Sequence, residues 1–516
     1  MRSWSARATG RAYVLLLLLL LVLLVLALPF IFRRPANSDR PVVARAGPSD
    51  ALVIITPHLE AVRRKFGNAF SQWYAQKYHR AVSLEYLGFG GGDIIRFFQA
   101  SEAAYQRSGT YNIDIVWGGS DSMFNDVLKS KYLDKVTLDP AAMTAAFPQA
   151  DIGGVPLYDS DPVNGPRWFG AALSSFGILF NRDLLKFLGL PEPKTWSDLA
   201  DPRYQGWVEL ADPTRSASAK TALMVIVERE MQTASQEHRA EADGWARGMG
   251  LIRQIVANAR GFTSAANELP GVVSSGDAAA AMAIDFYARA QIAAIGGGRI
   301  GYVEPQGATA VTPEPIAMAR GAPHAQTAQR FIEFVLSETG QRLWITKAGA
   351  GETPELSLQR LPIMPSVYDH PVNFTEFTNP YRIVGGFNTK PSRRAALGVM
   401  DELTALCCVD LLTELRATRK EIIQSPRAAE LDAKLGTFPV DLAASQAGMD
   451  VHGRMLKGKP EDWLILQRQW RRQFKEEYRE LRRAAVESSG GRTKGDGGRR
   501  ALGAAGAAAD SRGPSP

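Results

Sequence analysis

The stretch 85–98, EYLGFGGGDIIRFF, passes from a strand-like apolar run through three glycines into a helix-like apolar run. Glycine tolerates backbone conformations and close approaches that other residues do not, so Gly90–Gly92 predicts a sharp turn between a strand and a helix. Asp93 follows at the start of that helix. The pattern leaves three roles open for this turn, namely an anion cradle, a cation ligand at Asp93, or a simple helix cap.

The same strand-then-helix order continues on both sides of this stretch. Alternation of this kind predicts an α/β fold with largely parallel sheets. The strand-like runs cover 52–56, 82–87, 113–117, 174–181, 207–212 and the residues from Ala283 to 287, and the helix-like runs cover 60–78, 93–106 and 326–344.

The two ends of the chain differ from this body. Residues 35–50 form a Pro-rich linker, and helical patterns dominate 394–424 and 459–485. The last pattern predicts packing against the body, with a membrane-surface or partner helix as the alternative. Its apolar stripe consists of Trp463, Leu466, Trp470, Phe474, Tyr478 and Leu481. The Gly/Ala-rich residues 488–516 are predicted to be disordered.

The N-terminus carries an uncharged apolar run of 21 residues, 12–32, preceded by arginines. A helix of that length can cross a membrane, and the preceding arginines favour export of the rest of the chain. We favour a retained anchor within residues 1–34 over a cleaved signal peptide. The net charge of +7 is spread along the chain, so no nucleic-acid partner is predicted. The two cysteines, Cys407 and Cys408, are expected to be buried thiols on a helix.

Ligands of open α/β sheets bind beyond the carboxyl ends of the strands, where this chain places several polar residues and glycines. Hydroxyls and glycines at helix starts also leave backbone N–H groups free for an oxyanion. A lone His or an N-terminal Ser is more often structural than ligand-binding. The candidates from these strand ends are His58, Gly91, Gly92, Asp93, Trp117, Ser120, Ser216 and Ser218. Hydrolase-elbow, P-loop and HExxH patterns are absent, and no nucleophile–base pair stands out, so no enzyme is predicted.

The segment 190–218, LPEPKTWSDLADPRYQGWVELADPTRSAS, resembles the P-x-T-W-x-D-L-x-(D/N)-P-x-(Y/W)-x-G signature of extracytoplasmic solute-binding proteins of ABC importers. It is most similar to the branch that includes ferric-ion-binding proteins. Segments 176–190, 276–290 and 313–344 support the resemblance, which covers about 51–350.

The resemblance implies a two-lobed, periplasmic-binding-protein-like (type II) fold with a ligand between the lobes. Lobe 1 would cover 51–170, completed by 305–350, and lobe 2 would cover 171–304. A helical extension of unassigned role would follow at 351–487. The implied partners are an ABC permease and its ATPase, and the implied location is periplasmic, anchored to the inner membrane.

The ferric branch uses a His, a carboxylate and two adjacent tyrosines, which correspond here to His58, Asp93 and the pair Phe286–Tyr287. Phe286 replaces one phenolate, and Fe³⁺ favours several anionic oxygens. Strand alternation would place Asp285 on the same face as Tyr287, where it could compensate. A site from His58, Asp93, Asp285 and Tyr287 is therefore one reading, and an organic ligand stacked on Tyr287 is another.

Three ligand classes stay open at this point: a metal ion or chelate such as Fe³⁺, a small organic or phosphorylated solute, and a degenerate site without a ligand. The leading hypothesis is a membrane-tethered solute-binding protein that delivers its ligand to an ABC importer. Ligand contacts with both lobes would favour their closed state. The alternatives are a ligand-binding sensor or scaffold of the cell envelope and a dedicated ferric-ion-binding protein.

Overall fold

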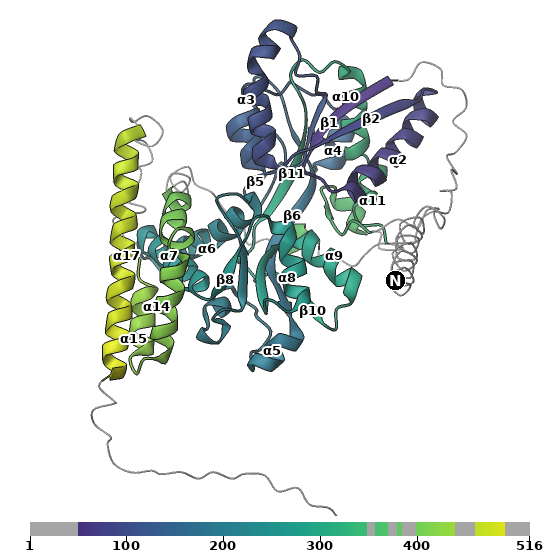
Figure 1. The fold of residues 1–516 in the computed structure, drawn as a ribbon. Coiled ribbons are helices and arrows are strands. Elements are labelled where there is room, and N and C mark those ends of the chain that lie inside the picture. Colours follow the sequence, from purple (N-terminus) through teal and green to yellow (C-terminus); the bar gives the residue numbers. More distant parts are fainter. Residues whose placement is uncertain (1–49, 348–356, 370–378, 384–398, 439–459, 491–516) are drawn as a thin grey trace, which may run out of the picture.

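The computed structural model describes residues 50–347, 357–369, 379–383, 399–438 and 460–490 (Figure 1). Two α/β lobes lie one above the other, and the helices of the C-terminal extension run along one side of the lower lobe. Within the described residues no helix is both long and apolar enough to cross a membrane. The apolar run 12–32, the greater part of the linker and the predicted tail from 491 onward lie outside them.

Lobe 1 is built around the parallel strands β1, β2 and β3, with helices on both faces. Alternating apolar residues place one side of each strand in the core. The elements of this part are β1 (Asp50–Thr56), α2 (Glu60–Tyr78), β2 (Val82–Gly88), α3 (Gly91–Ser108), β3 (Ile115–Trp117), η1 (Met123–Leu128), α4 (Pro140–Ala146), β4 (Asp151–Ile152) and β5 (Val155–Pro156).

Lobe 2 has the parallel neighbours β8, β7 and β9, and it is entered through the long strand β6. Its elements are β6 (Phe169–Asn181), α5 (Arg182–Leu188), η2 (Trp196–Ala200), η3 (Pro202–Tyr204), β7 (Val208–Ala211), α6 (Ala217–Gln236), α7 (Glu241–Ala257), β8 (Ala259–Thr263), η4 (Ala266–Glu268), α8 (Leu269–Ser275), β9 (Ala280–Ile284), α9 (Asp285–Ile295) and β10 (Ile300–Val303).

Two strands join the lobes. The whole of β6, FGAALSSFGILFN, is buried, because it serves both sheets. Its first half pairs with β11 (Val311–Met318) and its second half pairs with β9. β11 also pairs with β3, so the strand order β2-β1-β3-β11-β6-β9-β7-β8 runs continuously through both lobes. This topology confirms the predicted two-lobed α/β fold.

The chain then returns to lobe 1, and its last described helices pack on lobe 2. The elements are α10 (Ala325–Leu336), α11 (Glu338–Leu343), β12 (Leu361–Pro362), η5 (Pro365–Asp369), α12 (Pro380–Ile383), η6 (Ala405–Val409), α14 (Leu412–Gln424), α15 (Ala428–Leu435) and α17 (Pro460–Gly490). Trp470, Phe474 and Tyr478 of α17 are buried in the core of lobe 2, as the predicted apolar stripe requires. Cys407 and Cys408 are buried free thiols.

Two predicted elements are wrong. The run that was predicted as a strand through Tyr287 ends at Ile284, and Asp285 begins helix α9. The single helix predicted over 326–344 is interrupted at Ser337, whose extended backbone and hydroxyl cap start α11 as a second helix. In both cases apolar composition continues across the boundary, so hydrophobic periodicity does not show it.

Buried arginines fasten the C-terminal extension to lobe 2. The guanidinium of Arg253 on α7 donates to the carbonyls of Leu435 and Thr437, at 2.6 and 2.7 Å, and pairs with Glu477 of α17. The Arg253 side chain is fully buried. A buried charge is tolerated only when it is paired and hydrogen-bonded, so these contacts make the extension part of the lobe-2 core.

Candidate functional site

The strand registers bring the carboxyl ends of both sheets to one short section of the crossover strands. Trp117 at the end of β3 pairs with Ile316 of β11, and Ile284 at the end of β9 pairs with Phe176 of β6. β6 and β11 pair with each other through Ser175 and Val311. Residues that follow β1, β3 and β9 therefore converge beside these strands, where ligands of α/β sheets bind.

The carboxylate of Glu314 on β11 lies between His58 of lobe 1 and the buried guanidinium of Arg360. The Nε2 atom of His58, after β1, lies 3.3 Å from a carboxylate oxygen of Glu314. The same oxygen pairs with the guanidinium of Arg360, which comes from the segment that leads into β12. The side chains of His58 and Arg360 are nearly inaccessible, whereas the Glu314 side chain is 14% exposed. Burial alone would raise the pKa of Glu314, but the charges of Arg360 and His58 outweigh it and hold the pKa at about 2.

The guanidinium of Arg360 also lies over the ring of Phe286, 3.8 Å from its centroid. The negative face of an aromatic ring attracts a cation, and a partly desolvated pair gains most from this contact. Phe286 thus has a specific partner at the position where the ferric branch has a tyrosine. A side-chain cation occupies the space beside His58 and Glu314.

A second charged group lies on the lobe-2 side of the crossover. Arg289, one turn into α9, pairs with Glu304 at 2.8 Å, and Glu304 accepts a hydrogen bond from the hydroxyl of Ser175 at 2.6 Å. Arg289 is 20% exposed and Glu304 is 15% exposed, so the pair is partly open to solvent. This is the more accessible of the two arginines at the crossover.

Asp285 is the first residue of α9 and is completely buried. Neither carboxylate oxygen accepts a well-formed hydrogen bond from the described residues. Burial raises the pKa of Asp285 to about 7, with Arg289 and Arg360 opposing the shift and Glu304 adding to it. Its carboxyl is therefore partly protonated near neutral pH. Tyr287 lies two residues further along α9, packs against Phe286 with a centroid distance of 4.2 Å, and has a pKa raised by burial.

The structure brings only part of the predicted set together. His58, Asp285 and Tyr287 lie at the crossover. Gly91 and Gly92 form the first turn of α3, and Asp93 beside them is exposed and pairs with Arg96 of the same helix. Asp93 and Tyr287 therefore have different contacts, and the tentative metal set His58, Asp93 and Tyr287 stays a prediction. Within the described residues no cluster of His, Cys, Asp and Glu could hold a metal ion.

The remaining predicted residues have local partners. Trp117 is fully buried in the lobe-1 core, where its ring contacts Phe66 at 5.0 Å between centroids. The Ser120 hydroxyl accepts a hydrogen bond from the N–H of Met123 at the start of η1. Ser216 caps α6 by accepting from the N–H of Ala219, and Ser218 follows in the first turn as a half-buried residue.

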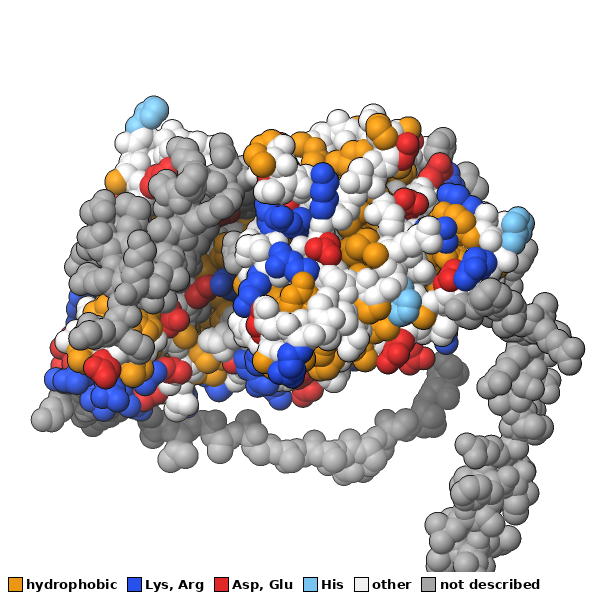
Figure 2. Space-filling model, turned by 90° about the horizontal axis from the view of Figure 1, so that it is seen from above, with side chains coloured by type: hydrophobic (Ala, Val, Ile, Leu, Met, Phe, Trp, Pro, Cys, Tyr) orange, Lys and Arg blue, Asp and Glu red, His pale blue; other side chains and the backbone are white. Residues whose placement is uncertain are grey.

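Sequence reasoning missed Glu314, Arg360 and Glu304. Glu314 follows Pro313 inside the segment that carries the resemblance, so its strand position offered a signal. Arg360 offered none, because the pairing of β12 with β6 brings it in from beyond the body of the fold. Viewed from above, charged side chains of both signs are interspersed with hydrophobic ones over the exposed face (Figure 2).

Residues 111–360 match the family of bacterial extracellular solute-binding proteins. The matched region is 250 of the chain's 516 residues and resembles an extracellular solute-binding domain. Proteins of this type serve ABC importers in the periplasm, and the family is one of binding proteins rather than enzymes.

Curated relatives extend the similarity beyond the matched family region. The phosphoglycerate transport regulatory protein of Salmonella typhimurium is 25% identical over 401 residues, which are 74% of this chain and 86% of the relative. An uncharacterised protein of Haemophilus influenzae is 27% identical over 172 residues, or 33% of this chain and 44% of the relative.

Solved structures of periplasmic binding proteins are also similar. The fructose-6-phosphate-bound AfuA of Actinobacillus pleuropneumoniae has 16% identity and a TM-score of 0.49, over 71% of this chain and all of AfuA. The apo ferric-ion-binding protein A of Pasteurella haemolytica has 15% identity and a TM-score of 0.46, over 68% of this chain and 97% of that protein.

Proposed function

We propose that this protein captures a small phosphorylated organic acid between its lobes and presents it to an ABC importer. The observation that carries the proposal is the Arg289–Glu304 pair, a partly exposed guanidinium at the crossover of the two lobes. Guanidinium groups bind phosphate and carboxylate oxygens in a bidentate manner. The name of the Salmonella relative, which refers to phosphoglycerate transport, supports this ligand class.

In this mechanism the ligand oxyanion replaces Glu304 as the partner of Arg289 when the lobes close. Arg360 and Glu314 remain paired, and Glu304 keeps its hydrogen bond from the hydroxyl of Ser175. The partly protonated Asp285 then adds little negative charge that would repel the ligand. The ligand contacts residues from both lobes only in the closed state, and this difference in contact favours closure.

Thermal denaturation tests the ligand class. We expect 3-phosphoglycerate to raise the melting temperature of the wild-type protein, whereas ferric citrate and spermidine leave it unchanged. Arg289→Gln should remove the shift, while Arg299→Gln, at an exposed position of the same lobe, should keep it. A shift with ferric citrate that Tyr287→Phe abolishes would instead support the ferric-ion alternative.

The apolar run 12–32 supports a membrane tether in the inner membrane as part of the same proposal. A second candidate function is a sensor that reports ligand binding to another envelope component. The word "regulatory" in the name of the Salmonella relative and the extension fastened to lobe 2 favour it. Uptake of labelled ligand in a deletion strain separates the two, because a sensor would change expression while leaving transport by an induced importer intact.

A further inference from the structure

We propose that lobe 1 carries a separate docking groove, between α2 and β2, that binds an extended acidic segment of a partner polypeptide as an added strand. The groove has a volume of about 490 Å³ and follows one face of α2 beside the first strand of the sheet. It is lined by Glu60, Arg63, Arg64, Gly67, Asn68, Ser71, Val82, Leu84 and Tyr86. The solute site described above lies elsewhere, at the crossover strands.

β2 is an edge strand, because β1 is its single partner among the described strands. The Asp50 N–H donates to the carbonyl of Ala81, and the Phe89 N–H donates to the carbonyl of Thr56. In a parallel ladder, every second residue of a strand directs its N–H and C=O groups to the same neighbouring strand. The odd-numbered residues of β2 therefore bond to β1. The N–H and C=O groups of Val82, Leu84 and Tyr86 therefore point to the open edge.

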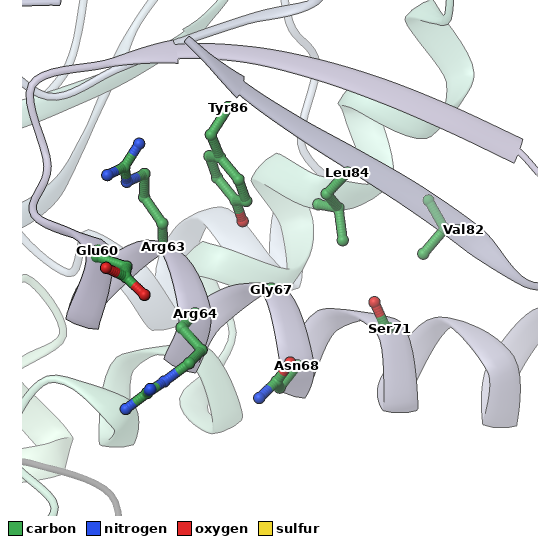
Figure 3. A pocket seen from close by; sticks show the side chains of 9 residues that line it. All are labelled: Glu60, Arg63, Arg64, Gly67, Asn68, Ser71, Val82, Leu84 and Tyr86. Atoms are coloured by element: carbon green, nitrogen blue, oxygen red, sulfur yellow. The ribbon is translucent and has the colours of Figure 1, made fainter. Parts of the chain in front are cut away.

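The same three residues direct their side chains into the groove. Figure 3 shows Val82, Leu84 and Tyr86 projecting from β2 toward α2, with Arg63 beside the Tyr86 ring. An edge strand offers unpaired backbone groups to another chain, and pockets for alternate side chains give such pairing its specificity. Open backbone groups and a side-chain groove thus coincide along β2.

The chemistry of the lining selects a negatively charged occupant. Neither Arg63 nor Arg64 has an acidic partner within 4.0 Å among the described residues. The Arg63 Nε and the Tyr86 hydroxyl are buried without a hydrogen-bond partner in the same part of the chain, and both are donors. Burial keeps the Tyr86 hydroxyl protonated by raising its pKa. Alternate acidic side chains of an added strand would supply the missing charge and acceptors.

The shape fits a polypeptide better than a small anion. β2 has seven residues, and a strand rises about 3.3 Å per residue, so the edge accommodates a segment of similar length. Gly67 of α2 keeps the middle of the groove open, since an added Cβ would lie 3.0 Å from the Tyr86 hydroxyl oxygen. A small anion at the arginines would leave most of the strand edge uncovered.

The test is fluorescence anisotropy with labelled peptides in the full-length protein. The probe alternates Thr and Asp over seven residues, and the matched control alternates Thr and Lys. We expect the acidic probe to bind and the basic one to fail. N-methylation of the amides that face β2 should weaken binding at least about tenfold, because it removes the backbone bonds, while N-methylation of the alternate amides should have little effect.

Protein variants complete the test. The double substitution Arg63→Glu with Arg64→Glu should abolish binding of the acidic probe, whereas Arg107→Glu on the exposed face of α3 should retain it. Both should keep the wild-type melting temperature and solute binding. Lack of binding by the acidic probe would overturn the proposal. Binding of the acidic probe that N-methylation does not weaken would also overturn it, and so would full competition by citrate. Either result would identify a site for a small anion rather than for an added strand.

Discussion

At the residue scale, charge balance explains why the ferric ligand pattern is incomplete. Phe286 stands where a phenolate is expected, and its ring receives the guanidinium of Arg360 at 3.8 Å. Glu314 pairs with this guanidinium and with His58. Phe286 and Glu314 therefore both contact a side-chain cation, Arg360. Phenylalanine in place of tyrosine fits this arrangement. The face of its uncharged ring already attracts the guanidinium, so no phenolate charge is required.

We predict that Arg360→Gln strongly destabilises the protein. The variant leaves the mostly buried Glu314 without its main counter-charge, and breaking a buried pair costs roughly 3–5 kcal/mol of the free energy of unfolding. Urea denaturation measures the loss. Arg427→Gln, which removes an exposed pair with Glu430, should cost no more than about 0.5 kcal/mol. Equal effects of the two substitutions would contradict the proposed role of the buried pair.

We predict that Asp285→Asn removes part of the pH dependence of the free energy of unfolding. The folded-state pKa of Asp285 is about 7, above its ordinary value of 3.8, so the folded protein binds one more proton than the unfolded chain between these pH values. Stability from this group is present below pH 3.8 and is lost as the pH rises toward 7. In the wild-type protein this loss amounts to at most ~1.4 kcal/mol of the free energy of unfolding per pH unit. Asp285→Asn has no ionisable group at this position, so its stability does not fall in this way.

Denaturation curves at pH 4, 6 and 8 provide the comparison. The stability of Asp285→Asn should increase relative to wild type at each step toward pH 8. Asp93→Asn, at an exposed carboxylate, serves as the control and should follow wild type closely. Parallel curves for wild type and Asp285→Asn would show that the carboxyl of Asp285 ionises normally.

At the scale of elements, the sequence predicted runs of regular structure better than their boundaries. Strands 52–56, 82–87 and 113–117 overlap β1, β2 and β3, because short apolar runs between turn residues are distinctive. The change from β9 to α9 at Asp285 gave no such signal. Strand alternation between Asp285 and Tyr287 was therefore a wrong premise, since both residues lie in the first turn of a helix.

Packing of the C-terminal extension against α7 supports a prediction at this scale. A Cβ added to Gly250 would lie 1.7 Å from the carbonyl oxygen of Gly436, which is backbone and has little freedom to move. Gly250→Ala should therefore cost at least about 1–3 kcal/mol of the free energy of unfolding. Gly271→Ala in α8 meets no atom within 4 Å and should be neutral or slightly stabilising. Similar melting temperatures for both variants would argue against this tight contact.

At the scale of the whole molecule, the resemblance and the strand–helix alternation were enough to predict two α/β lobes. They could not predict the charged groups of the crossover, because these come from segments distant in sequence. The pairing of β12 with β6 brings Arg360 into contact with Glu314. The hydrogen bond between Ser175 and Glu304 joins residues that are 129 positions apart in the sequence. Single-sequence patterns describe neighbours along the chain, whereas a cleft between lobes is assembled from long-range contacts.

The central claim is that an oxyanionic solute binds at the lobe crossover through Arg289. Isothermal titration of the protein with 3-phosphoglycerate, beside ferric citrate as the competing ligand class, tests it most directly. We predict saturable one-to-one binding of 3-phosphoglycerate that Arg289→Gln weakens at least about tenfold, as expected for the loss of a charge-assisted hydrogen bond. Binding of ferric citrate alone, or 3-phosphoglycerate binding that Arg289→Gln leaves unchanged, would contradict the claim.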